Sequence, residues 1–89
     1  MKKQKFELGQ TVITSGAGQL DHSEISVALA RHSTGDWGDI CEDDAEMNEQ
    51  SLIHGERLIS SYKTSDGTKF WIITERDRSA TTILLPSEY

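Results

Sequence analysis

A chain of 89 residues has material for one hydrophobic core, because so short a chain buries only about 60% of the surface that it exposes when unfolded. Its 15 acidic and 9 basic residues give a formal net charge of -6, which disfavours contact with the phosphates of nucleic acid or anionic lipid. These numbers exclude a multidomain enzyme, and we expect neither a direct nucleic-acid partner nor a membrane partner.

The compartment is indicated by what the sequence lacks. No apolar run approaches the ~20 residues of a membrane span, and the basic first residues continue into Phe6, Glu7 and Leu8 in place of an apolar signal core. Cys41 is the single cysteine, so no disulfide can form within the chain, as is typical of a reducing compartment. We therefore expect a cytoplasmic protein.

The first part of the chain predicts a tail followed by a strand. Residues 1–5 are rich in lysine and predict a disordered basic tail, whereas residues 6–89 predict a single α+β domain. Alternating apolar residues predict a first strand near 6–15, which ends at the glycines that follow it.

Two helices come next, each introduced by an aspartate with a glutamate three residues later, which is the pattern of a capping box. Asp21 introduces a predicted helix over 22–33, and Asp39 introduces a second over 40–54. A glycine follows each helix and can adopt the left-handed conformation that ends helices. Asn48 lies on the apolar stripe of the second helix, so we expect its amide to bond to the backbone of a strand or loop.

After residue 57 the apolar period changes from that of a helix to the period of two that is typical of strands. Strands are predicted near 58–62, 70–73 and 81–85, and the Asp-Gly pair between the first two is a strong hairpin signal. The second half is therefore a three-strand antiparallel meander.

These elements predict an α+β fold in the order strand, helix, helix and three strands, with a mainly antiparallel four-stranded sheet and both helices on one face. The middle strand is apolar on both faces, so each face needs cover. Strand one, loops and termini supply the second cover, or a homodimer does, and we expect the intramolecular cover. The predicted core consists of Val12, Ile25, Leu29, Ala45, Leu52, Leu58, Tyr62, Phe70, Trp71, Ile72, Ile73, Ile83 and Leu85.

Two segments carry a resemblance to a known family: residues 30–39, ARHSTGDWGD, and residues 71–89, WIITERDRSATTILLPSEY. Over residues 6–89 the chain resembles a group of small uncharacterised bacterial proteins that are often plasmid- or phage-related. Some members are mislabelled as type I restriction modification subunits, although so small a domain lacks the core that binds the methyl donor. The resemblance implies a compact α+β fold without an established activity, and it supplies no catalytic residue.

Candidate binding residues gather between the two predicted helices. Trp37 lies among glycines and aspartates, either as an exposed recognition residue or folded onto the core, and we expect the core position. Arg31, His32, Asp36 and Asp39 offer the imidazole and carboxylates that bind divalent ions. The alternative is a helix end whose basic residues complement the dipole. The spacing matches no metal motif, so we predict no metal and no cofactor.

A charged link precedes the last strand and contains Glu75, Arg76 and Arg78. Arginine forks in this link are suited to an anion or to a partner's carboxylate. The alternative is a turn whose ions pair across the hairpin, as weak surface pairs do. We retain these three residues as candidate binding residues.

The acidic residues are unevenly spread: seven of the fifteen carboxylates lie between residues 36 and 49, where no lysine or arginine occurs. Such a row either imitates DNA phosphates, as an acidic anti-restriction protein does, or keeps a small domain in solution. Solubility is the favoured interpretation.

We therefore expect a small protein-interaction module, with another protein as its partner and a link to plasmid or phage biology, rather than an enzyme. An enzyme needs a cleft with convergent titratable groups, and the three histidines are scattered along the chain. The alternative enzyme is a metal-assisted hydrolase around His32, Asp36 and Asp39.

Overall fold

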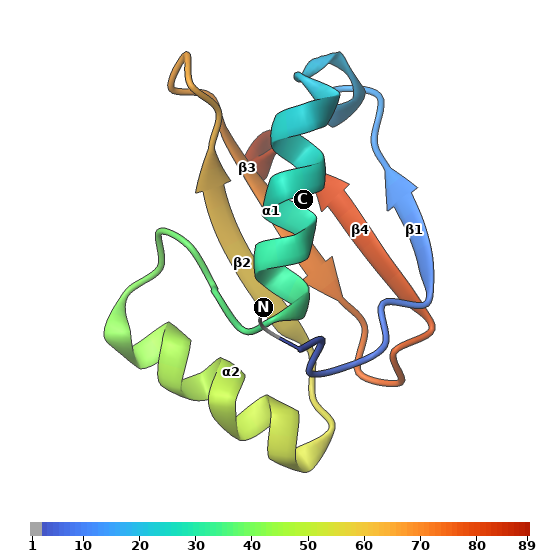
Figure 1. The fold of residues 1–89 in the computed structure, drawn as a ribbon, viewed down its shortest axis with the longest axis vertical. Coiled ribbons are helices and arrows are strands. Elements are labelled where there is room, and N and C mark those ends of the chain that lie inside the picture. The colour runs from blue at the N-terminus through green and yellow to red at the C-terminus, as the bar shows by residue number, and fades with distance from the viewer. Residues whose placement is uncertain (1–2) are drawn as a thin grey trace.

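The structure, a computed structural model that describes residues 3–89, contains a four-stranded sheet and two α-helices within that range (Figure 1). Short 3-10 turns lie at Ala17–Gln19 and Pro86–Glu88. The elements have the predicted order: β1 (Gln10–Ile13), α1 (His22–Ser33), α2 (Glu42–His54), β2 (Leu58–Lys63), β3 (Lys69–Thr74) and β4 (Ala80–Leu84). The prediction of an α+β domain is confirmed.

The sheet has the strand order β1-β4-β3-β2 and is mostly antiparallel. β2, β3 and β4 form the predicted meander, and β1 pairs with β4 in parallel. In the turn between β2 and β3, Gly67 has φ 91°, a conformation that glycine adopts without steric penalty. The parallel pairing of β1 with β4 places residues from both ends of the chain side by side in the sheet.

α1 lies across one face of this sheet (Figure 1). It begins as predicted, because the Asp21 carboxylate accepts hydrogen bonds from the N–H groups of Ser23 and Glu24 at 2.8 and 3.4 Å. The Glu24 carboxylate does not complete a capping box but accepts the N–H of Ser65, at 2.6 Å. The helix is thereby tied to the hairpin between β2 and β3.

The main core lies between α1 and the sheet. It consists of Ala17, Ile25, Ala28, Tyr62, Phe70, Ile72 and Ile83, with Leu20, Leu29 and Leu85 packed against it. The prediction was wrong for Val12, which is 41% exposed, because β1 is an edge strand that α1 does not cover. Trp71 is only partly buried, whereas Leu84 is buried without having been predicted, and Trp37 is buried as expected.

The opposite face of the sheet is covered in part by the end of the chain. Ile73 and Leu84 are buried on this face, where the ring of Tyr89 packs edge-on against Trp71 with centroids 5.6 Å apart. Arg57 donates to the Tyr89 hydroxyl at 2.6 Å and lies over its ring. This cover comes from within the chain, as expected.

α2 lies beside β2 at the edge of the sheet (Figure 1). It begins at Glu42, after an N-cap residue, Cys41, whose side chain makes no capping bond, so the predicted Asp39 cap was wrong. The reason is tertiary: the Asp39 N–H donates to the Ser61 carbonyl at 2.7 Å. This bond holds Asp39 against β2 in a non-helical conformation, so the helix starts later.

Asn48 joins α2 to the outer edge of β2, which confirms the expected backbone bond. Its amide nitrogen donates to the Ile59 carbonyl at 2.8 Å, and its amide oxygen accepts the Ile59 N–H at 3.2 Å. The side chain therefore imitates a neighbouring strand. Two residues along, the N–H of Ser61 donates to the Trp37 carbonyl at 3.2 Å, so the β2 edge is occupied at Ile59 and Ser61.

Asn48→Ala is expected to lower the free energy of unfolding by about 2 kcal/mol, because it removes two hydrogen bonds at a half-buried strand edge. Asn48→Asp is expected to be at least as destabilising, since a carboxylate then faces the Ile59 carbonyl. Gln50→Ala is the matched control, because Gln50 bonds to Glu46 on the exposed side of α2. Urea unfolding and amide exchange at Ile59 measure both effects, and equal stability of the Asn48 and Gln50 variants contradicts the assignment.

The predicted basic tail, residues 1–5, lies only partly within the described residues. Residues 1–2 lie outside them, whereas Lys5 donates its N–H to the Ser33 carbonyl at 2.7 Å. Neither α1 nor α2, the helices found in residues 3–89, combines the length and apolar character of a membrane span.

Candidate functional site

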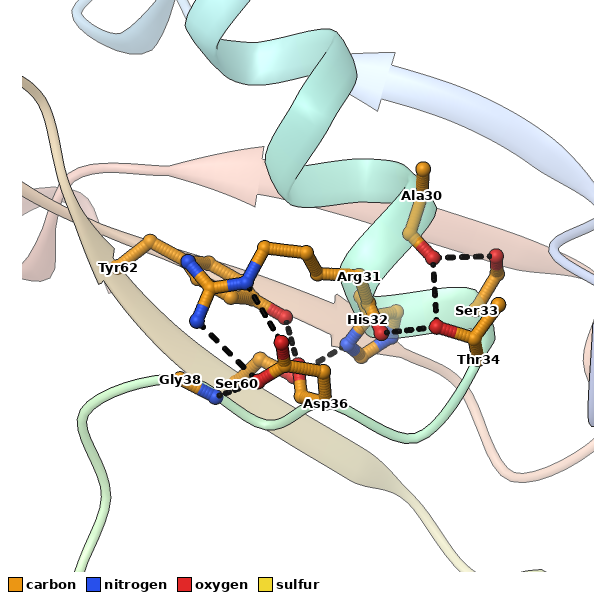
Figure 2. Close-up of polar contacts among 9 residues, drawn as sticks. All are labelled: Ala30, Arg31, His32, Ser33, Thr34, Asp36, Gly38, Ser60 and Tyr62. Carbon is orange, nitrogen blue, oxygen red and sulfur yellow. Dashed lines mark hydrogen bonds and ion pairs between the residues drawn. The ribbon is translucent and has the colours of Figure 1, made fainter. Parts of the chain in front are cut away.

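Arg31 and Asp36 form a bidentate ion pair at the end of α1 (Figure 2). The Arg31 guanidinium donates to both carboxylate oxygens of Asp36, at 2.8 and 3.2 Å, and this bond raises the pKa of Arg31. Arg31 also lies over the Tyr62 ring, and the Tyr62 hydroxyl donates to the Asp36 carbonyl at 2.7 Å. The pair therefore fastens the loop after α1 to β2.

His32 is fully buried and bonded to hydroxyl groups, of which Figure 2 shows that of Ser60. Its Nδ1 lies 2.5 Å from the Ser60 hydroxyl and its Nε2 lies 2.8 Å from the Thr74 hydroxyl. The Thr74 hydroxyl is 2.8 Å from that of Thr81, which donates to the Leu8 carbonyl at 2.7 Å. These hydrogen bonds thus connect α1, β2, β3, β4 and the segment before β1, with the imidazole bonded directly to β2 and β3.

The direction of the hydrogen bonds in this row of hydroxyl groups fixes the tautomer of His32. Since Thr81 donates to a carbonyl, its oxygen accepts from Thr74, and the Thr74 oxygen in turn accepts from Nε2–H of His32. Nδ1 is then the acceptor of the Ser60 hydroxyl. The ring is neutral, and burial, together with repulsion from Arg78, lowers its pKa to about 4.

This arrangement is unsuited to catalysis or metal binding. Ser60 and His32 resemble a nucleophile and its base, but both side chains are inaccessible to solvent, so no substrate can reach them. A metal ion could bind His32 only by displacing one of the two hydroxyls. Within residues 3–89 no group of three His, Cys, Asp or Glu side chains is placed to hold a metal ion. The geometry gives the hydrolase alternative no support.

Trp37 lies in the interior, as expected, and not on a recognition surface. Its indole N–H donates to the Glu49 carboxylate of α2 at 2.8 Å. Its ring stacks on Phe6, with centroids 6.2 Å apart, and meets the edge of His32 at 5.7 Å. The next residue, Gly38, has φ 74°, and a Cβ there would lie 2.1 Å from a β2 carbonyl. Trp37 therefore joins α2 to the core.

The charged link before β4 supports α2. Arg78, with φ 60°, donates to the carbonyls of Ser51 and Glu56 at 3.1 and 2.6 Å, where α2 ends. Arg76 makes an exposed ion pair with Glu56 at 3.5 Å, and the Glu75 carbonyl accepts the Arg78 N–H within the turn. The structure thus places this group at the end of α2, apart from the Arg31 and Asp36 pair.

A groove beside α2 was missed by the sequence reasoning. Its volume is about 530 Å³, and Met47, which lines it, is 67% exposed. The groove runs between α2 and the start of β2 and is lined by Ile40, Asp44, Glu46, Met47, Asn48, Gln50, Ser51, His54, Glu56, Arg57 and Ile59. The signal in the sequence is a methionine in a polar helix, off the stripe of residues 41, 45, 48 and 52.

The charges around this groove are unequal. Asp44 and Glu46 line it from the acidic half of α2, whereas Arg57 lines it from the start of β2. Glu49 and Asp36, from the same acidic stretch, already bond to Trp37 and Arg31. Of the acidic side chains that line the groove, Asp44 and Glu46 lie on the N-terminal half of α2, and Glu56 lies after the helix, where it pairs with Arg76.

Comparison with protein-family models, curated proteins and solved structures finds no match to this chain. The resemblance to plasmid- and phage-related proteins stays a prediction. The groove beside α2 is the candidate functional surface.

Proposed function

We propose that this chain is a protein-interaction module that binds its partner in the groove beside α2. The observation that carries the proposal is Met47, an apolar side chain that is 67% exposed and lines the groove together with Ile40 and Ile59. Methionine adapts to differently shaped apolar ligands, and exposed apolar surface inside a polar rim is typical of protein-binding sites.

The rim indicates the chemistry of the partner. Asp44 and Glu46 favour a segment that places basic residues beside the apolar side chain that enters the groove. The net charge of -6 attracts such a basic partner to this protein. Added salt screens this attraction and weakens it.

Two further parts of the proposal concern the location of the protein and its biological setting. A cytoplasmic location is supported by Cys41, the single cysteine, which is exposed and unpaired. A link to plasmid or phage biology is supported only by the resemblance of residues 30–39 and 71–89.

The test is affinity capture from the cells that make this protein, with Met47→Asp compared with Ile53→Asp. Both residues are exposed on α2, at 67% and 73%, but Ile53 does not line the groove. We expect Met47→Asp to lose the captured protein and Ile53→Asp to retain it. Neutralisation by Asp44→Asn and Glu46→Gln is expected to weaken capture at low salt.

Three outcomes oppose the proposal. If both aspartate variants capture the same proteins as the wild type, the groove is not the binding surface. If nothing is captured, the proposal that the chain is a protein-interaction module is wrong. If DNA-binding enzymes are captured, and Met47→Asp captures them as well as the wild type does, the result favours the alternative that the acidic face of α2 imitates DNA.

A further inference from the structure

The two edges of the sheet are treated differently. Most of the β2 edge is occupied, because Asn48 bonds to the backbone groups of Ile59, and the segment at Trp37 and Asp39 bonds to those of Ser61. The other edge is β1, and Figure 1 shows it as the outermost strand, with no further strand or helix of residues 3–89 beyond it. An open edge strand is a template for another strand.

The backbone groups of this edge can be identified from the ladder. Gln10 donates its N–H to the carbonyl of Ser79, just before β4, at 2.9 Å, and Thr14 donates to Ile83 of β4 at 3.0 Å. The alternation of a strand places Val12 in the same direction. The N–H and C=O groups of Thr11 and Ile13 therefore point away from β4. The side chains along this edge are open as well, since Val12 and Ile13 are 41% and 43% exposed.

This edge carries none of the charges that usually protect one. Residues 8–20 contain no Asp, Glu, Lys, Arg or His, although 27% of the chain is charged. Natural edge strands are often guarded by lysine or by an inward charge. Glu88 is the carboxylate bonded nearby, and it is held by Thr14 and Gly16 past the end of the strand.

We propose that a second copy of this chain pairs with β1, antiparallel and about a two-fold axis at Val12. In that register Thr11 of each copy exchanges both backbone bonds with Ile13 of the other, so all four outward groups of the strand are satisfied. The two Val12 side chains then face each other across the axis as a non-hydrogen-bonded pair, the closest kind of cross-strand pair.

The charge distribution favours a second copy over an unrelated strand. The acidic stretch lies on and before α2, beside β2, at the opposite edge of the sheet. Two chains of net charge -6 can therefore meet at their uncharged edges while their acidic helices stay at the far ends. The product is a continuous eight-stranded sheet that leaves both α2 grooves free, so this inference is independent of the proposed function.

The interface is small, because each copy contributes a strand of four residues, and small interfaces are weak. We expect sedimentation velocity to show a monomer in dilute solution and a dimer at high concentration. Val12→Lys places two like charges on the axis and is expected to abolish the dimer, whereas Val27→Lys, at an exposed position of α1, leaves it intact. A monomer at every concentration, or a dimer that survives Val12→Lys, overturns the proposal.

Cross-linking tests the register directly. In a Cys41→Ser background, Val12→Cys brings two thiols together across the axis, within reach of a disulfide. Oxidised glutathione is expected to convert this variant to a covalent dimer much faster than the matched Ile53→Cys variant, whose thiol is exposed on α2. Equal rates for the two variants overturn the β1 pairing even if a dimer exists.

Discussion

Phe70→Ala is expected to lower the free energy of unfolding by about 3–5 kcal/mol. Phe70 is 1% exposed and packs against Tyr62, with ring centroids 5.8 Å apart. It fills the space between β3 and α1, and alanine leaves a cavity that the surrounding side chains cannot close completely. Since a domain has only about 5–15 kcal/mol of stability in total, the variant should unfold at a much lower temperature or urea concentration.

Trp71→Ala is the matched comparison on the next residue of β3. Trp71 faces the opposite side of the sheet, where it is partly exposed and packs against Tyr89. We therefore expect a clearly smaller loss than for Phe70→Ala, although both remove an aromatic ring. Circular dichroism during urea and thermal unfolding gives the order, and a Phe70 variant that is as stable as the wild type contradicts the assigned core.

The contrast between these neighbours indicates what the sequence could and could not predict. The short apolar run after the Asp-Gly pair identified β3, and the Asp21 cap and Gly35 gave the two ends of α1, because these signals lie within or beside one element. The depth of burial at Trp71 and Val12 depends on what covers each face of the sheet. That cover comes from segments far away in the chain, which no local pattern identifies.

α2 illustrates the same limit at a boundary. Asp39 has the composition of a cap, yet its backbone bonds to Ser61, 22 residues later in the chain, and the helix starts at Glu42. Asn48 was predicted correctly because an amide on an apolar stripe has to find a backbone partner. The groove at Met47 was not predicted, since it exists only because α2 lies beside β2.

The candidate site residues also depend on contacts between distant parts of the chain. Sequence proximity suggested that His32, Asp36 and Asp39 act together, and the structure separates them. His32 faces Ser60 and Thr74, which lie 28 and 42 residues away, whereas Asp36 bonds to Arg31. Such pairs form when α1 settles on the sheet, and no spacing rule anticipates them.

His32 should make the stability of this protein depend on pH between about 4 and 6.5. Burial lowers its pKa from the ordinary 6.5 to about 4 in the folded state, so between these values the unfolded chain binds one proton more. Stability is therefore full above pH 6.5 and falls as the pH is lowered to 4. The shift corresponds to about 3 kcal/mol.

The groups around His32 explain why the proton is excluded. A protonated ring needs two acceptors, but the Ser60 hydroxyl donates to Nδ1, and Arg78 adds a second positive charge nearby. Hydrogen bonds also lower the pKa of the carboxyl groups of Asp21, Asp66, Asp77 and Glu88. These carboxyl groups reduce stability only at lower pH, below their unfolded values near 4, so the window above pH 4.5 belongs to His32.

His32→Gln separates this titration from every other one. Glutamine keeps one donor and one acceptor but no titrating group, so urea unfolding of the variant should change little between pH 6.5 and 4.5, whatever its absolute stability. His22→Gln and His54→Gln are the controls, because both histidines are exposed, and these variants should keep the slope of the wild type. Loss of the slope in a control variant, or its persistence in His32→Gln, means that the buried imidazole is not the group that the acid titrates.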